Sequence, residues 1–140
     1  YQHVSLSQDS AYLAIGERTN ANGSKAFREA LLEGRIDDYS LEWDSRYALG
    51  VVMVADGYPG DYPRGDEIHG LDEINSSDIK VFHAGTRTEH HKILTDGGRV
   101  LCVTALGQTL IDAQKNAYSG VGSIQWSGAG WRPDIGWRAV

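Results

Sequence analysis

The 140-residue sequence contains little cysteine and no long hydrophobic run. Its single cysteine, Cys102, excludes a disulfide scaffold, and the surrounding apolar run Val100–Val103 predicts that the thiol packs as a small hydrophobic side chain. No stretch of about 18 apolar residues occurs, so the sequence predicts no membrane-spanning helix. The polar residues Tyr1–Ser10 lack the pattern of a secretory signal. We therefore expect a globular protein of the cytoplasm that does not bind membranes.

Basic residues are also scarce, since 13 Lys and Arg stand against 19 Asp and Glu and give a formal net charge of -6. A nucleic-acid partner needs a basic face to displace its counterions, so nucleic-acid binding is not expected. The excess of acid lies between Asp56 and Asp78, where Arg64 is the only base among Lys and Arg. These acids lack the spacing of a calcium loop, and we interpret the stretch as a solvated loop region.

The familiar catalytic and metal-binding patterns are missing as well. Five histidines occur, but His90 and His91 are adjacent, and neighbours on a strand point to opposite faces. No serine lies in a nucleophile elbow, and Gly97-Gly98 precedes a strand, whereas a phosphate loop precedes a helix. Gly107-Gln108-Thr109 does precede a predicted helix, where helix capping explains it as well as an anion site does. We predict no metal, no cofactor and no catalytic residue.

Glycine is abundant, at 17 residues, and short elements are therefore expected. Alternating or continuous apolar runs predict strands, of which residues 48–55 should be buried on both faces. Asp96-Gly97-Gly98 predicts a hairpin between the last two strands, because glycine tolerates positive φ. The expected strands cover residues 11–15, 48–55, 80–84, 92–94 and 99–106.

Helical spacing predicts two helices, over residues 24–33 and from Thr109 onward. Asp112 completes a capping box with Thr109, and Gly120 and Gly122 are expected to end this second helix. Three tryptophans, at positions 126, 131 and 137, are expected to pack against the sheet. Together the elements predict one α+β domain, residues 1–140, with a mainly antiparallel sheet and at least two packed helices.

Residues 41–140 carry an ordered series of motifs that resembles the C-terminal domain of glycinamide ribonucleotide synthetase (phosphoribosylamine–glycine ligase). The motifs are Glu42-Trp43-Asp44, Ala48–Met53, Gly57–Tyr62, Gly65–Leu71, Val81–Thr86, Gly97–Gly107, Ala113-Gln114-Lys115 and Asp134–Ala139. The resemblance implies the fold of that domain, which belongs to an ATP-grasp ligase of purine biosynthesis. It also implies substrate-side positions at Tyr58, Pro59, Gly60, Asp61, Gly85 and Thr86.

One position and one short segment depart from the family pattern. Asp56 stands where a glycine is usual, and Ser127–Gly130 replaces a bulkier segment. The family's nucleotide and magnesium ligands lie mainly in its central domains, which have no counterpart in this sequence. The resemblance therefore implies a domain that has no catalytic activity of its own.

Residues 8–38 resemble a second family, through the run Tyr12–Ala30. This run is similar to the first strand, loop and helix of the folate-binding domain of cobalamin-dependent methionine synthase, and Asn20 matches a loop position near the pterin. The sequence is thus expected to be a chimera, an artificial or selected recombinant, with a methionine-synthase-like segment 1–39 and a ligase-like segment 40–140.

Three functional hypotheses follow. The first is a recombinant domain without independent activity. The alternatives are a ligase fragment that acts with an ATP-grasp partner chain, and a folate or nucleotide binding module based on Asn20 and the helix from Ser24. Surface left bare by domain truncation further predicts self-association as a homodimer.

Overall fold

The computed structural model describes residues 5–7, 10–12, 32–34 and 44–139. The chain divides into two compact units, residues 1–45 and 46–140. In the first unit, strand β1 (Ser5–Ser7) pairs antiparallel with β2 (Ser10–Tyr12). The helix expected over 24–33 and most of the strand expected over 11–15 lie outside the described residues. The single domain and the change of segment near residue 40 stay predictions.

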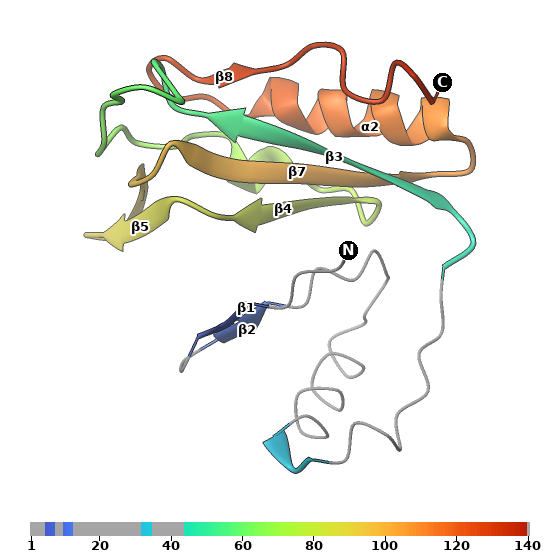
Figure 1. The fold of residues 1–140 in the computed structure, drawn as a ribbon, viewed down its shortest axis with the longest axis horizontal. Coiled ribbons are helices and arrows are strands. Elements are labelled where there is room, and N and C mark those ends of the chain that lie inside the picture. Colours follow the sequence, from blue (N-terminus) through green and yellow to red (C-terminus); the bar gives the residue numbers. More distant parts are fainter. Residues whose placement is uncertain (1–4, 8–9, 13–31, 35–43, 140) are drawn as a thin grey trace. The chain divides into compact units, whose positions relative to one another are not determined.

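The second unit is built on a four-stranded antiparallel sheet with the strand order β4-β7-β3-β8 (Figure 1). Its two longest strands pair along their length, from Tyr47 opposite Gly107 to Met53 opposite Leu101. The predicted α+β class with an antiparallel sheet is therefore confirmed. The strands are β3 (Tyr47–Val54), β4 (Ile79–His83), β7 (Arg99–Gly107) and β8 (Gly130–Trp131).

Helix α2 (Leu110–Ser123) packs along β3 and β7 on one face of this sheet (Figure 1). Ala113, Ala117 and Val121 recur at helical spacing and are buried in the interface. Gly120 lies in the same interface, where a Cβ atom would come within 2.9 Å of Val103. The expectation that Gly120 and Gly122 end the helix is wrong: both lie inside it, and Gly120 allows the helix to approach the sheet closely.

Strand β3 alternates between buried and exposed residues. Leu49, Val51 and Met53 are buried beneath α2, whereas Gly50 and Val52 are exposed. The prediction of burial on both faces is therefore wrong. An apolar run without charges indicates a strand, but within the second unit α2 covers only one face of it.

The predicted hairpin at Asp96-Gly97-Gly98 is also wrong. Strand β6 (Lys92–Thr95) pairs with β5 (Thr86–Glu89), and β7 pairs with β3 and β4. The tight turn lies at His90 and His91, whose φ angles are 48° and 63°. The expectation that the two histidines lie on a strand and point to opposite faces is therefore wrong, because both lie in this turn.

Aromatic and sulfur side chains are less buried than expected. Trp126 is buried in the core, but Trp131 and Trp137 are 41% and 59% exposed. Packing against the sheet is therefore confirmed for Trp126 alone. Cys102 is half-buried on the sheet face opposite α2, with its Sγ atom 3.6 Å from Oγ1 of Thr104.

Candidate functional site

The loop that follows β3 carries four of the six predicted substrate-side residues. Backbone hydrogen bonds fix both of its ends: Ala55 N donates to Gly98 O (2.9 Å), and Gly65 N donates to Thr95 O (2.7 Å). Inside the loop Gly60 N donates to Gly57 O (2.8 Å). Gly57 has a φ of 82°, which favours glycine. This part of the Asp56–Asp78 stretch is thus a loop, in agreement with its interpretation as a loop region.

Three side chains of this loop form a ladder that rests on Gly98. The rings of Tyr58 and Tyr62 lie 6.4 Å apart at an angle of 56°, and the Arg64 guanidinium lies 5.5 Å from the Tyr62 ring centre. A Cβ atom on Gly98 would come within 2.9 Å of both rings. We call Tyr58, Tyr62 and Arg64 the aromatic ladder, and Gly98 its seat.

Gly85, which lies between β4 and β5, makes backbone contacts on either side of Gly98. Its carbonyl oxygen accepts hydrogen bonds from Asp96 N (2.8 Å) and Gly97 N (3.1 Å), and its amide donates to Val100 O. A Cβ atom on Gly85 would lie 2.7 Å from the Gly97 Cα atom. The two backbones therefore touch, and the structure gathers Tyr58 and Gly85 around the Gly97-Gly98 pair.

The remaining predicted positions lie around this cluster. Pro59, Gly60 and Asp61 are exposed on the loop, and Thr86 begins β5, where its Oγ1 atom is 3.1 Å from His83 Nδ1. Their role as substrate-side residues stays a prediction. Asn20, the predicted folate-side position, lies outside the described residues.

The two departures from the family pattern meet in space. Gly128, which has a φ of 73°, stands directly against Asp56, and a Cβ atom on Gly128 would lie 2.6 Å from the Asp56 Cβ atom. A larger residue at position 128 would displace the Asp56 side chain. The sequence alone contains no sign of this contact, because 72 residues separate the two positions.

The acidic stretch is partly neutralised by neighbouring cations. Glu67 accepts a hydrogen bond from Lys92 Nζ (2.7 Å), which holds the pKa of this carboxyl below its ordinary value. Asp78 pairs with Arg46 at 2.9 Å. Within the part of the chain that the structure describes, no group of three His, Cys, Asp or Glu side chains is arranged to hold a metal ion.

The start of α2 has its predicted capping box. Thr109 Oγ1 accepts a hydrogen bond from Asp112 N (3.1 Å), and Asp112 Oδ2 accepts from Thr109 N (3.2 Å). The Thr109 hydroxyl also donates to Asp112 Oδ2 (2.7 Å), and this bond, together with the one from Thr109 N, lowers the pKa of the Asp112 carboxyl. Side chains of the helix itself thus satisfy amides that the anion-site alternative would have used.

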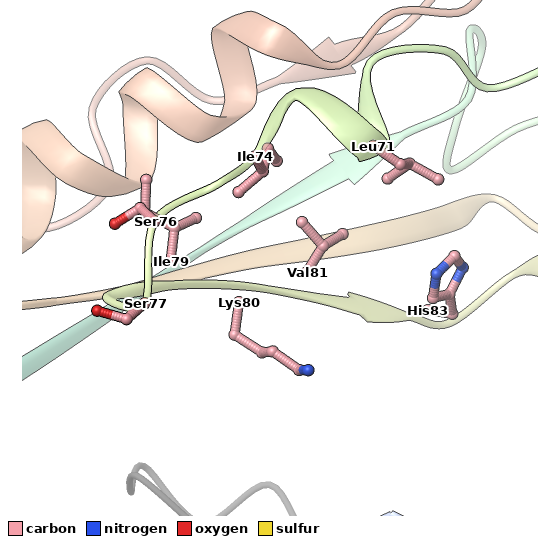
Figure 2. Close-up of a pocket in the computed structure, with 8 residues that line it drawn as sticks. All are labelled: Leu71, Ile74, Ser76, Ser77, Ile79, Lys80, Val81 and His83. Carbon is pink, nitrogen blue, oxygen red and sulfur yellow. The ribbon is translucent and has the colours of Figure 1, made fainter. Parts of the chain in front are cut away.

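A groove that the sequence did not predict lies beside β4. This groove has a volume of about 430 Å³ and separates β4 from the short 3-10 helix η2 (Leu71–Glu73) and the residues after it. Figure 2 shows Ile79, Val81 and His83 on the side of β4 that faces η2, whereas the Lys80 side chain extends the opposite way. The sequence signal for this groove is the presence of apolar residues at alternate positions of a strand. The acidic segment next to that strand also contains apolar residues, Leu71 and Ile74.

The C-terminal segment is tied to α2 by two polar side chains. The Tyr118 hydroxyl donates to Arg132 O (2.7 Å) and accepts from Ile135 N (2.9 Å), and Gln114 Nε2 donates to Ile135 O (2.7 Å).

No helix among the described residues is long and apolar enough to cross a membrane.

These features define a small α+β domain in which one helix covers an antiparallel sheet and a glycine-seated loop follows the first long strand. A sequence model of the family described as "Phosphoribosylglycinamide synthetase, C domain" matches residues 48–138. The chain belongs to this family.

Individual relatives agree with this assignment. The chain is 58% identical over 111 residues to a phosphoribosylamine–glycine ligase of Allochromatium vinosum, and 54% identical over 112 residues to the ligase of Salmonella typhimurium. Each match covers 79% of this chain and 26% of the relative, so the chain spans about a quarter of the length of these enzymes.

A solved structure gives the same result. A crystal structure of phosphoribosylamine–glycine ligase from Thermotoga maritima matches with a TM-score of 0.61 and 31% identity, covering 79% of this chain and 27% of that one. The likeness to the C-terminal domain of an ATP-grasp ligase, predicted from the motifs of residues 41–140, is confirmed.

Proposed function

We propose that residues 46–140 act as the C-terminal domain of a phosphoribosylamine–glycine ligase, and that this chain has no turnover by itself. The observation that carries the proposal is the convergence of Tyr58 and Gly85 on the Gly97-Gly98 pair within a domain of this family. The loop from Asp56 to Arg64 would form one wall of a substrate site that other domains complete. A site needs its surrounding scaffold to hold its groups in place, and the matches cover about a quarter of the relatives.

Complementation in trans tests both parts of this proposal. The full chain is mixed with a ligase that lacks its own C-terminal domain, such as a truncated Allochromatium vinosum enzyme, and phosphate release from ATP is followed in the presence of phosphoribosylamine and glycine. We expect no turnover by either component alone and turnover by the mixture. Turnover by the chain alone would refute its dependence on a partner, and no rescue at saturating chain would refute its contribution to the site.

A matched control comes from α2. Gly122 has no heavy atom within 4 Å of the position a Cβ would take, so Gly122→Ala leaves the loop and the sheet untouched. This variant should rescue the truncated ligase as well as the unmodified chain does. A loss of rescue by Gly122→Ala would show that the assay reports general folding and not the loop.

We further propose that the N-terminal segment has a separate origin, in methionine synthase. The run Tyr12–Ala30 supports this origin. The ligase match covers 79% of 140 residues and therefore includes residues that precede Leu41, so a junction as proposed would lie N-terminal to them. Sequencing the flanking DNA tests the idea: ligase coding sequence that continues without a break upstream of residue 8 would refute it.

The folate or nucleotide module stays an alternative, because Asn20 and Ser24 lie outside the described residues. Calorimetric titration of the full chain with methyltetrahydrofolate and with ATP decides it, and no heat at millimolar ligand would dispose of it. The homodimer and the cytoplasmic location also stay predictions. A monomeric mass by light scattering at high protein concentration would refute the homodimer.

A further inference from the structure

Positive φ does not explain the glycine at Gly98 or those at the neighbouring positions 97 and 85. Gly97, Gly98 and Gly85 are all absent from the residues with positive φ, although Gly57 and Gly65 on the adjoining loop do have positive φ. A φ outside the left-handed region does not by itself favour glycine. A property other than positive φ therefore explains why these positions hold glycine.

That property is space. A Cβ atom on Gly98 would overlap the ring of Tyr58 and come within 2.9 Å of Tyr62 Cε1. Real Cβ atoms do not approach carbon this closely, so either the rings or the backbone of Gly98 would have to move.

The backbone of Gly98 is the more firmly held of the two. Gly98 is buried, its carbonyl accepts the hydrogen bond from Ala55 N, and the next residues of β7 include Val100 and Leu101, both fully buried in the core. Tyr58, by contrast, is 39% exposed. A side chain at position 98 would therefore push the rings outward and leave the strand in place.

Movement of Tyr58 would reach the rest of the ladder. Tyr58 contacts Tyr62, and the Arg64 guanidinium lies over the Tyr62 ring, where a cation is attracted by the ring electrons. All three belong to the loop whose ends are fixed at Ala55 and Gly65. A shift at the seat is thus carried along the loop to Arg64.

We propose that Gly98 is a positioning residue: by lacking a side chain, it sets how closely the aromatic ladder lies against β7, and so fixes the substrate-facing loop. The inference rests on the proposed ligase function for its effect on activity, but the seating itself is a property of this chain alone. Gly98 touches no substrate and acts only through Tyr58 and Tyr62.

Gly98→Ala in the full chain tests the seat, with Gly122→Ala as the matched glycine-to-alanine control. In chain labelled with 13C at tyrosine, we expect the Tyr58 and Tyr62 ring resonances to shift in Gly98→Ala and to stay in place in Gly122→Ala. In the complementation mixture, Gly98→Ala should raise KM by about tenfold or more with kcat nearly unchanged, because the loop contributes binding and not chemistry. Unshifted ring resonances, or a loss confined to kcat, would overturn the proposal.

A double-mutant cycle covers the case in which Gly98→Ala folds poorly. The fall in unfolding midpoint caused by Gly98→Ala should be smaller in a Tyr58→Ala background, since most of the clash is then gone. An equal fall in both backgrounds would overturn the seat. If the unmodified chain fails to rescue the truncated ligase, the proposed function fails, while the resonances and the cycle still decide the role of Gly98.

Discussion

The His90-His91 turn and the Gly97-Gly98 link lie a few residues apart, and their residue types are the reverse of what their backbones favour. The histidines take φ angles of 48° and 63°, which suit glycine, whereas the two glycines have no positive φ. The histidine turn is exposed, and Gly98 is buried under two rings. The difference teaches that glycine in the second region is selected by the space around it and not by its dihedral angles.

The sharpest test of that comparison is Gly85→Ala, where the obstacle is backbone. A Cβ atom there would lie 2.6 Å from Arg99 O and 2.7 Å from Gly97 Cα, and neither atom can rotate away. We expect the free energy of unfolding to fall by about 3 kcal/mol, at the upper end of overpacking costs. Chemical denaturation measures this, and a loss no larger than that of an exposed surface substitution would contradict the steric explanation.

A second test changes the His90-His91 turn, where the residues have positive φ but are not glycine. Replacing His90-His91 by Asn-Gly matches the residues to the two-residue turn that joins β5 and β6, in which both positions have positive φ. We expect a gain of about 1 kcal/mol in the free energy of unfolding, from relief of left-handed strain. As the control, Gly97→Asn creates the same Asn-Gly pair at positions 97 and 98, and it should destabilise the protein. A destabilised turn variant would mean that the histidines make contacts which outweigh the strain.

A glycine with free space around it should behave unlike Gly85 and Gly98. Gly122 lies in α2 with nothing within 4 Å, and alanine is the better helix former. Gly122→Ala should raise the free energy of unfolding by about 0.5 kcal/mol, because the unfolded chain loses conformational freedom. Thermal melting followed by circular dichroism detects the change, and a lower midpoint would show a close contact that the structure does not contain.

The smallest effect is expected at the exposed ion pair beside the hairpin. The hydrogen bond from Lys92 lowers the pKa of Glu67 in the folded state, so the unfolded state binds protons first as the pH falls. The contribution of the pair is complete above about pH 5 and is lost as the pH falls through the lowered pKa of Glu67. Denaturation of Glu67→Gln between acid and neutral pH should show a slightly flatter pH dependence, and an unchanged slope would contradict this.

Local signals in the sequence predicted elements well and their pairing poorly. The spacing of Thr109 and Asp112 was enough to locate the start of α2, because a capping box is made within four residues. The Asp96-Gly97-Gly98 signal failed because it cannot distinguish a glycine needed for positive φ from one needed for space. The contact that makes the difference comes from Tyr58, some 40 positions away in the chain.

The same limit applies to the candidate site. The loop residues Tyr58–Asp61 and the position Gly85 were found through a family resemblance. The contacts of Tyr58 with Gly98 and of Gly85 with Gly97 depend on the sheet order, which no single segment encodes. The Asp56–Gly128 contact was missed for the same reason, because it joins residues that only the folded sheet brings together. The groove beside β4 differs, since residues 71–83 of one short segment line it.

The two outer strands of the main sheet have a consequence for assembly. One, β8, is only two residues long and is soon followed by Pro133, which has no amide hydrogen to donate; the other, β4, carries the exposed Lys80 at its second position. Short strands, prolines and lysines at sheet margins discourage the addition of further strands and the aggregation that follows. Association between copies of this chain is therefore expected to use side-chain surfaces, and not a sheet that continues from one copy into the next.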